Sequence, residues 1–213
     1  MEKLDKISDE SAFKELTILK DRLIKLRNDR LVKINHSVME LICSRHLIIR
    51  GYTVDVERSL DGISCDIFGV KGMSNLIVEI ETGFIPPEHA LDPLTYSQAR
   101  TASKITRYSN YSNKFCLGTP PHYIMQLPNA LTKPARKRTE DEIGEIKELC
   151  DLYYHNPPVS LDEIRNANIH LIYIIDVDNA TVQEIEPERY IDKTKTWSNN
   201  SNKRFFEKFI PTQ

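Results

Sequence analysis

The sequence predicts an α/β protein whose mixed central β-sheet is flanked by helices. Apolar residues recur at three- and four-residue steps in some segments, as in amphipathic helices, and alternate with polar residues in others, as in half-buried strands. With 40% apolar and 28% charged residues, the chain of 213 residues can bury a sizeable core. We expect a single domain over residues 1–213, because no repeat or low-complexity linker divides it.

The first predicted element is an amphipathic helix over residues 9–33, which makes up most of a helical extension, residues 1–35. Its apolar stripe is formed by Phe13, Leu16, Leu19, Leu23 and Leu26. A stripe this regular suits a partner helix in a dimer, and it equally suits packing on the chain's own domain. A third interpretation makes the stripe the functional surface of an assembly protein.

The next region, residues 36–118, is predicted to begin with a helix over residues 37–50 that ends at Gly51. Ser37 and Glu40 have the spacing of a capping box, in which side chains bind the free N–H groups of the first helical turn. The period then changes to that of β-strands. Three strands are expected at residues 52–57, 64–70 and 75–82, with turns at 61–62 and 71–72.

The rest of the chain is predicted to complete the sheet and its helical cover. The expected elements are a loop at 82–93, a helix at 94–112, a strand at 114–117, a basic loop at 128–139, an acidic helix at 140–154 and hairpin strands at 169–177 and 180–185. Residues 119–213 are expected to belong to the same domain, with Phe205, Phe206 and Phe209 packed on its body.

Two carboxylates end the third predicted strand. Residues 76–78 are apolar at consecutive positions, as in a strand that is covered on both faces. Glu79 and Glu81 follow on the face that Ile77 occupies. Because burying unpaired carboxylates is costly, we expect them to meet cations, a metal ion or water in a cleft.

A further acid, Asp66, lies in the second predicted strand, where aspartate is disfavoured. If the second and third strands pair, Asp66 and Glu79 lie side by side on one face. Two such carboxylates suit a hard divalent cation such as Mg²⁺, which generates a hydroxide nucleophile, binds a phosphate oxygen and stabilises a leaving alkoxide. Glu40 either reaches across from its helix to hold a metal-bound water or a second ion, or serves only as a cap.

Glu40, Asp66 and Glu79-x-Glu81, in the order helix, three strands, helix, strand, resemble the PD-(D/E)XK nuclease superfamily, and archaeal Holliday-junction resolvases in particular. The whole chain is also similar to a small protein of spindle-shaped archaeal viruses that has been placed in this superfamily. The resemblance covers residues 37–117 and implies an αβββαβ restriction-endonuclease-like core. It implies that Asp66 and Glu79 are metal ligands together with the Ile80 carbonyl, and that Glu40 is the helix-borne catalytic acid.

One position departs from the family pattern, which usually has lysine where this chain has Glu81. A carboxylate cannot perform the electrostatic role of an ammonium group. Some members move the lysine to the following helix, where Lys104 is the candidate here, with Tyr108 one helical turn away. For Glu81 itself, a salt bridge with Arg100, Lys104 or Arg107 is the favoured interpretation.

The resemblance implies a Mg²⁺- or Mn²⁺-dependent endonuclease that hydrolyses phosphodiester bonds of DNA, with branched or junction DNA as a candidate substrate. A resolvase makes two symmetric cuts, so a homodimer is expected. The alternative is a catalytically inactive nucleic-acid-binding module on the same fold, which the glutamate at position 81 permits.

Basic charge is local in this chain, whose formal net charge is only −2. If the basic segments converge beside the carboxylates, they track DNA phosphates; otherwise they are solvated faces. The predicted nucleic-acid contacts are Arg100, Arg107, Tyr108, Lys133, Arg136, Lys137 and Arg138.

Other functional classes lack their motifs. The sequence has no phosphate-binding loop, dinucleotide fingerprint or serine-hydrolase elbow, and its scattered cysteines predict neither a zinc ribbon nor a disulfide scaffold. No apolar run reaches the length of a membrane span, and no secretory signal is evident, so an intracellular location is expected. Structural or surface roles are expected for His36, His46, His89, His122, His155 and His170.

Overall fold

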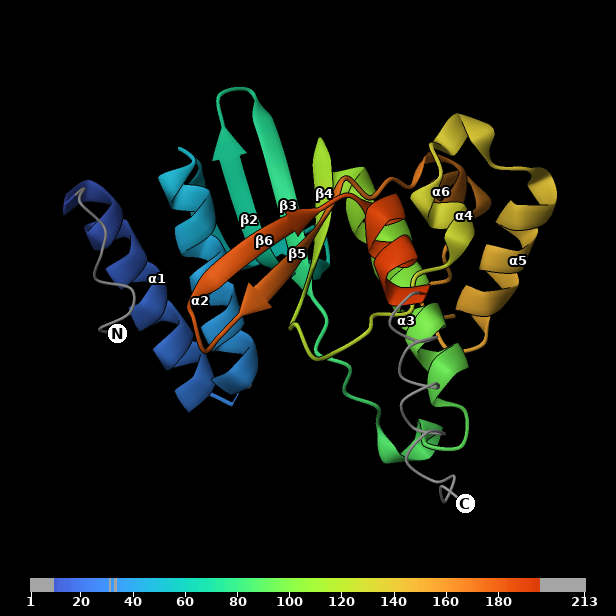
Figure 1. The fold of residues 1–213 in the computed structure, drawn as a ribbon, viewed down its shortest axis with the longest axis horizontal. Coiled ribbons are helices and arrows are strands. Elements are labelled where there is room, and N and C mark those ends of the chain that lie inside the picture. The colour runs from blue at the N-terminus through green and yellow to red at the C-terminus, as the bar shows by residue number, and fades with distance from the viewer. Residues whose placement is uncertain (1–9, 31, 33, 196–213) are drawn as a thin grey trace, which may run out of the picture.

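A computed structural model describes residues 10–30, 32 and 34–195 (Figure 1). In this part of the chain, six strands form one sheet in the order β1-β2-β3-β4-β5-β6. The strands are β1 (Thr53–Leu60), β2 (Ile63–Lys71), β3 (Ser74–Ile80), β4 (Lys114–Thr119), β5 (Leu171–Asp176) and β6 (Thr181–Ile185). The β3–β4 and β4–β5 pairs are parallel and the other pairs are antiparallel. The predicted mixed sheet is confirmed.

Helices cover both faces of this sheet, which gives the molecule three layers (Figure 1). One face carries α2 (Ile34–Ile49), with α1 (Glu10–Asn28) outside it. The longer helices on the opposite face are α3 (Pro93–Tyr108), α5 (Glu140–Asp151) and α6 (Leu161–Asn166). Short helical pieces are η1 (Pro87–His89), η2 (Ser109–Tyr111), α4 (Asn129–Thr132) and η3 (Ala135–Lys137), and residues 187–195 are also helical. No helix within the described ranges is long and apolar enough to cross a bilayer.

Strand β3 runs between two separate apolar clusters, as its sequence predicts. Leu76, Val78 and Ile80 pack under α1 and α2, whereas Ile77 packs under α3 and α5. The side chains alternate between faces because successive residues of a strand point to opposite sides of the sheet. Both clusters exclude water, so β3 is buried from Leu76 to Ile80, and the Glu79 side chain is buried together with its apolar neighbours.

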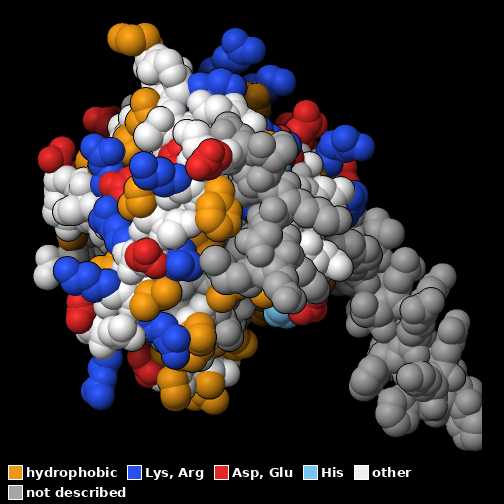
Figure 2. Space-filling model, turned by 90° about the vertical axis from the view of Figure 1, so that its left-hand side faces the viewer, with side chains coloured by type: hydrophobic (Ala, Val, Ile, Leu, Met, Phe, Trp, Pro, Cys, Tyr) orange, Lys and Arg blue, Asp and Glu red, His pale blue; other side chains and the backbone are white. Residues whose placement is uncertain are grey.

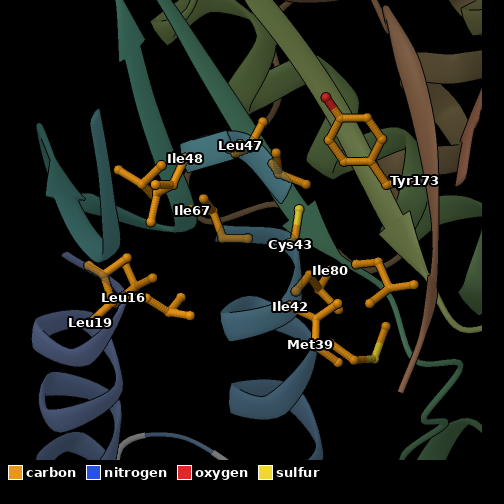
Figure 3. Packing of buried hydrophobic residues seen from close by; sticks show 14 of the residues in the cluster. Leu16, Leu19, Met39, Ile42, Cys43, Leu47, Ile48, Ile67, Ile80 and Tyr173 are labelled. Atoms are coloured by element: carbon orange, nitrogen blue, oxygen red, sulfur yellow. The ribbon is translucent and has the colours of Figure 1, made fainter. Parts of the chain in front are cut away.

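The apolar stripe of α1 packs on the chain's own domain. Leu16, Leu19 and Leu23 are buried against α2 and β1, and Figure 3 shows the first two facing Ile48 and Ile67. The three leucines are therefore occupied within the chain, which supports packing on its own domain, whereas Phe13 of the same stripe is 42% exposed. A role of this helix in a dimer or an assembly stays a prediction. The side of the molecule that carries α1 shows cations, acids and small hydrophobic groups intermixed (Figure 2). The homodimer stays a prediction without support from this helix.

Several element boundaries differ from the predicted ones. Helix α2 begins at Ile34, before Ser37, so Ser37 is not the N-cap residue and the predicted capping box does not form. The predicted stop at Gly51 is confirmed, with a φ of 80° that favours glycine. The sequence did not predict α6 or the short helices within the basic loop. Phe205, Phe206 and Phe209 lie outside the described residues.

The packing of α1 predicts that its buried and exposed apolar residues differ sharply in their effect on stability. Leu19 is 4% exposed and its neighbour Ile18 is 61% exposed. We expect Leu19→Ala to lower the free energy of unfolding by about 2–4 kcal/mol, through lost burial and a residual cavity. Ile18→Ala, the matched control, should change it by about 0.5 kcal/mol or less. Urea denaturation followed by circular dichroism measures both; equal effects would show that α1 does not pack in this register.

Candidate functional site

The site begins where strands β2 and β3 part. Their last ladder pair in this direction is Ile67 with Val78, and continuing the register places Asp66 opposite Glu79. At this point each side-chain carboxylate accepts a backbone N–H of the opposite strand, as a backbone carbonyl does in a continuous β-ladder. The Asp66 N–H donates to Glu79 Oε1 over 2.9 Å, and the Ile80 N–H donates to Asp66 Oδ2 over 2.5 Å. The predicted pairing of these strands, with the two acids side by side, is confirmed.

Glu40 joins these acids from the other side of the sheet's edge. Its side chain is fully buried, and neither carboxylate oxygen has a hydrogen-bond partner among the described residues. His36 lies one helical turn earlier, with its Nε2 3.1 Å from Asp66 Oδ1 and 3.8 Å from Glu40 Oε1. The capping interpretation of Glu40 is wrong, because α2 begins six residues before it. Its helix instead directs the carboxylate toward Asp66.

Helix α3 supplies the cations. Lys104 Nζ lies 2.7 Å from Glu81 Oε1 and 3.2 Å from Glu79 Oε2, and it donates to the Ile80 carbonyl over 3.1 Å. Arg100 donates through Nε to Glu81 Oε1 over 3.1 Å. The predicted salt bridge of Glu81 is therefore confirmed, with Lys104 and Arg100 as its partners. Lys104 also lies beside the strand acids, as a helix-borne replacement for a strand lysine must.

Two further residues of this cluster were not predicted as functional. Glu57 lies opposite Asp66 in the β1–β2 register and has a φ of 49°, a strained value for a residue with a side chain. Its place in an alternating strand made it look solvent-facing. His36 was assigned a structural or surface role for lack of a metal-binding spacing. One signal in the sequence indicates its place in the cluster. His36 lies four residues before Glu40, a spacing that puts both side chains on one face of a helix.

Burial, together with the excess of acids, raises the pKa values of two carboxyl groups of this cluster. Burial raises the pKa of Glu40 to about 9, and the charges of Asp66, Glu57 and Glu79 add to this effect. Burial and the neighbouring Asp66 carboxylate likewise raise the pKa of Glu79 to about 8. Glu40 therefore holds a proton near neutral pH when no further cation is present, and Glu79 ionises less readily than an ordinary glutamate.

Asp66 and Lys104 stay charged. Burial raises the pKa of Asp66, but Lys104, His36 and the Ile80 N–H outweigh that effect and hold the pKa below its ordinary value. Burial lowers the pKa of Lys104, but the carboxylates of Glu81, Glu79 and Asp66 outweigh it and raise the pKa above its ordinary value. Asp66 thus remains ionised over a wider pH range than Glu40 or Glu79.

A pocket of about 210 Å³ opens beside the carboxylates on the α3 side. The residues around it are Ile63, Arg100, Ser103, Lys104, Arg107, Tyr108 and Tyr154. The Arg107 guanidinium faces the Tyr154 ring and donates to the Pro157 carbonyl, and the Tyr108 hydroxyl donates to the Ser64 carbonyl over 2.7 Å. Lys104 and Arg100 therefore meet the acids, as predicted, whereas Arg107 binds the Pro157 carbonyl, and DNA binding by these cations stays a prediction.

The basic loop after β4 needs one correction. Arg138 is buried, so its assignment as a nucleic-acid contact is wrong. Its guanidinium donates to the backbone carbonyls of Ala130, Leu131, Lys133, Ile164 and Arg165. Those bonds tie the loop to the end of α6. Arg136 and Lys137 are exposed, and Lys133 is ion-paired with Glu142.

Carboxylate and carbonyl oxygens of this kind are the ligands that a hard divalent cation prefers, and metal binding here stays a prediction. No group of three or more His, Cys, Asp or Glu side chains in the described part of the chain is arranged to hold a metal ion. Mg²⁺ needs only one or two carboxylates, however, and completes its shell with water. Asp66, Glu79 and the Ile80 carbonyl carry such oxygens, which already bind Lys104, His36 and backbone N–H groups. The two buried oxygens of Glu40 accept no hydrogen bond within the described residues and are suited to accept one from the water of such an ion.

Comparison with protein-family models, with curated proteins and with solved structures gives no match. The class of this chain is therefore described by its fold and its site alone. This chain is a three-layer α/β protein with an acidic cluster at the edge of β2 and β3, closed by cations from one helix.

The raised pKa of Glu40 predicts a specific loss of stability with rising pH. The folded state holds this proton up to about pH 9, whereas the unfolded chain releases it near its ordinary pKa of 4.5. Stability from this group is therefore complete below the unfolded pKa and is lost as pH rises toward the folded pKa, by about 1 kcal/mol per pH unit.

Glu40→Gln should remove that part of the slope, while the similar but separate effect of Glu79 remains. Urea denaturation between about pH 5.5 and pH 8, with a chelator present, measures the slope. Glu188→Gln, a change at an exposed carboxyl, is the matched control and should keep the wild-type slope. Parallel curves for wild type and Glu40→Gln would contradict the buried, unpaired state of Glu40.

The buried guanidinium of Arg138 predicts a structural role. We expect Arg138→Met to lower the free energy of unfolding by about 2–4 kcal/mol, because the carbonyls that it binds lose their donors. The exposed neighbour Lys137 provides the control, since Lys137→Met should leave stability within about 0.5 kcal/mol of wild type. Thermal and urea unfolding measure both. An unchanged stability of Arg138→Met would contradict the structural role of Arg138.

Proposed function

We propose that this protein is a Mg²⁺- or Mn²⁺-dependent endonuclease that hydrolyses phosphodiester bonds of DNA. The observation that carries the proposal is the meeting of Asp66 and Glu79 where β2 and β3 part, with Lys104 of α3 between Glu79 and Glu81. Glu40 joins from α2 with two buried oxygens that accept no hydrogen bond within the described residues. This arrangement supports the resemblance to PD-(D/E)XK nucleases, including the transfer of the lysine from the strand to the helix.

In this proposal Asp66, Glu79 and the Ile80 carbonyl hold the ion. A divalent ion bound there polarises a phosphate oxygen and lowers the pKa of water. Side chains of the protein position the water and neutralise charge. The unpaired oxygens of Glu40 accept hydrogen bonds from water and hold a proton at Oε1 or Oε2, which suits its raised pKa. The Lys104 ammonium neutralises charge that develops on the phosphate oxygens.

The pocket beside Lys104 provides a place for the phosphate and its neighbours. Arg100 and Arg107 bring positive charge to it, and the Tyr108 ring forms part of its wall. Arg136 and Lys137, exposed on the loop after β4, and Lys133 beside them would bind phosphates farther along the DNA. Branched or junction DNA is a candidate substrate, and a homodimer would place two such sites for paired cuts.

The decisive test is metal-dependent cleavage of labelled DNA by the purified chain. We expect Mg²⁺ or Mn²⁺ to support nicking of a four-way junction, of a linear duplex, or of both, and a chelator to abolish it. Asp66→Asn should lower the rate by at least about 100-fold, because it removes an ionised ligand. Asp162→Asn, a change in an exposed ion pair, should retain wild-type activity. Undiminished cleavage by Asp66→Asn would show that the site has been assigned wrongly.

A second candidate is a DNA-binding module that does not hydrolyse DNA. Its support is the engagement of Lys104 by Glu81, Glu79 and the Ile80 carbonyl, which closes the cluster with a side-chain cation. For this function we expect salt-sensitive DNA binding in the presence of a chelator, with no cleavage on adding Mg²⁺. A filter-binding or fluorescence titration at several salt concentrations, run with the cleavage assay, separates the two candidates.

A further inference from the structure

The ammonium of Lys104 occupies a built cation position. Three oxygens surround Nζ at distances of 2.7, 3.2 and 3.1 Å, from Glu81, Glu79 and the Ile80 carbonyl respectively. The side chain is 17% exposed, and Glu79 and Glu81 are almost completely buried. A protonated amine held by three oxygens in a buried setting serves the same electrostatic purpose as a bound ion, because it neutralises carboxylates that would otherwise be costly to bury.

Two of these three oxygens belong to the donor set that the proposed function assigns to a divalent ion. Glu79 and the Ile80 carbonyl cannot bind the ammonium and a divalent cation at the same distance, because two cations a few Å apart repel each other strongly in a partly buried site. The third oxygen, on Glu81, lies outside that donor set. Glu81 can therefore keep Lys104 as its partner while the other two contacts are broken.

The adjoining pocket gives the ammonium somewhere to go. Lys104 itself lines this pocket of about 210 Å³, together with Ser103, Tyr108 and Tyr154. The flexible four-carbon stem of a lysine lets its ammonium turn toward the pocket by rotation about its own bonds. Arg100 donates to the same Oε1 atom of Glu81. This bond holds the Glu81 carboxylate in place while the lysine side chain rotates.

We infer that Lys104 is the resident cation of the acidic cluster, and that a divalent ion binds by displacing its ammonium from Glu79 and the Ile80 carbonyl into the adjoining pocket, with Glu81 as the anchor. This inference rests on the proposed function for the nature of the ion. It gives Glu81 a positioning role, because a carboxylate at this place retains the helix-borne lysine in both positions. The exchange also delivers the ammonium to the pocket where a phosphate is expected.

The first test measures the accessibility of the Lys104 amine. Acylation requires a neutral, reachable amine, so Lys104 should react slowly with acetic anhydride in the chelated protein. Addition of Mg²⁺ should raise its acylation rate several-fold, as followed by peptide mass spectrometry. Lys147, ion-paired with Asp151 on α5, is the control lysine and should react at the same rate in both conditions. A Lys104 rate that stays constant or falls while Mg²⁺ binds would overturn the displacement.

The second test measures Mg²⁺ affinity by titration calorimetry at about pH 9, above the pKa of about 8 of Glu79. If Lys104 fills the position nine-tenths of the time, Lys104→Met should bind Mg²⁺ about tenfold more tightly than wild type. Lys147→Met removes one positive charge from α5, where its ammonium pairs with Asp151, and is the matched control. Lys147 does not line the pocket into which Lys104 moves, so the Mg²⁺ affinity of this variant should stay within about twofold of wild type.

The outcomes separate this inference from the proposed function. Tighter binding by Lys104→Met alone supports the exchange, even if the wild-type chain proves to bind Mg²⁺ too weakly to cleave DNA. Mg²⁺ binding that is equal or weaker in Lys104→Met overturns the exchange and leaves a metal-dependent nuclease intact. Mg²⁺ binding by neither protein overturns both.

Discussion

The rest of the site depends on the reciprocal hydrogen bonds between Asp66 and Glu79. Each carboxylate accepts a backbone N–H of the opposite strand at the point where the ladder between β2 and β3 ends. Because the acceptors are ionisable side chains, ending the ladder in this way also buries charge. That charge fixes what must pack around it: a lysine and an arginine from α3, and a histidine from α2.

The acids of this cluster outnumber the cations that meet them. Glu40, Glu57, Asp66, Glu79 and Glu81 gather near Lys104, Arg100 and His36. The cations do not fully balance the acids, and the pKa values of Glu40 and Glu79 are raised by burial and by the neighbouring carboxylates. A site in this state favours a further cation, which is why the hypotheses of metal-dependent hydrolysis and of lysine exchange arise from the same geometry. The strained backbone at Glu57, opposite Asp66, adds to the cost of keeping this arrangement.

Prediction from the sequence succeeded where a short-range rule fixed the outcome. The two-residue period of β3 placed Glu79 and Glu81 on the face of Ile77, and that face meets α3 with Lys104 and Arg100. Prediction failed where long-range packing decided the outcome. Arg138 is charged and lies in a basic loop, so nothing local distinguishes it from a surface cation. Its burial depends on carbonyls contributed by α6, more than twenty residues away in the chain.

The sequence by itself determined the α/β class, the order of the strands along the chain and the strand face of each acid, because periodicity and turn chemistry act over a few residues. Tertiary structure alone decided that α1 packs on its own domain, that Glu40 points at Asp66 instead of capping its helix, and that His36 and Glu57 belong to the cluster. Those outcomes depend on which surfaces meet across the sheet. The surfaces that meet are those whose packing buries the apolar core as a whole, and a pattern of a few residues does not determine that packing.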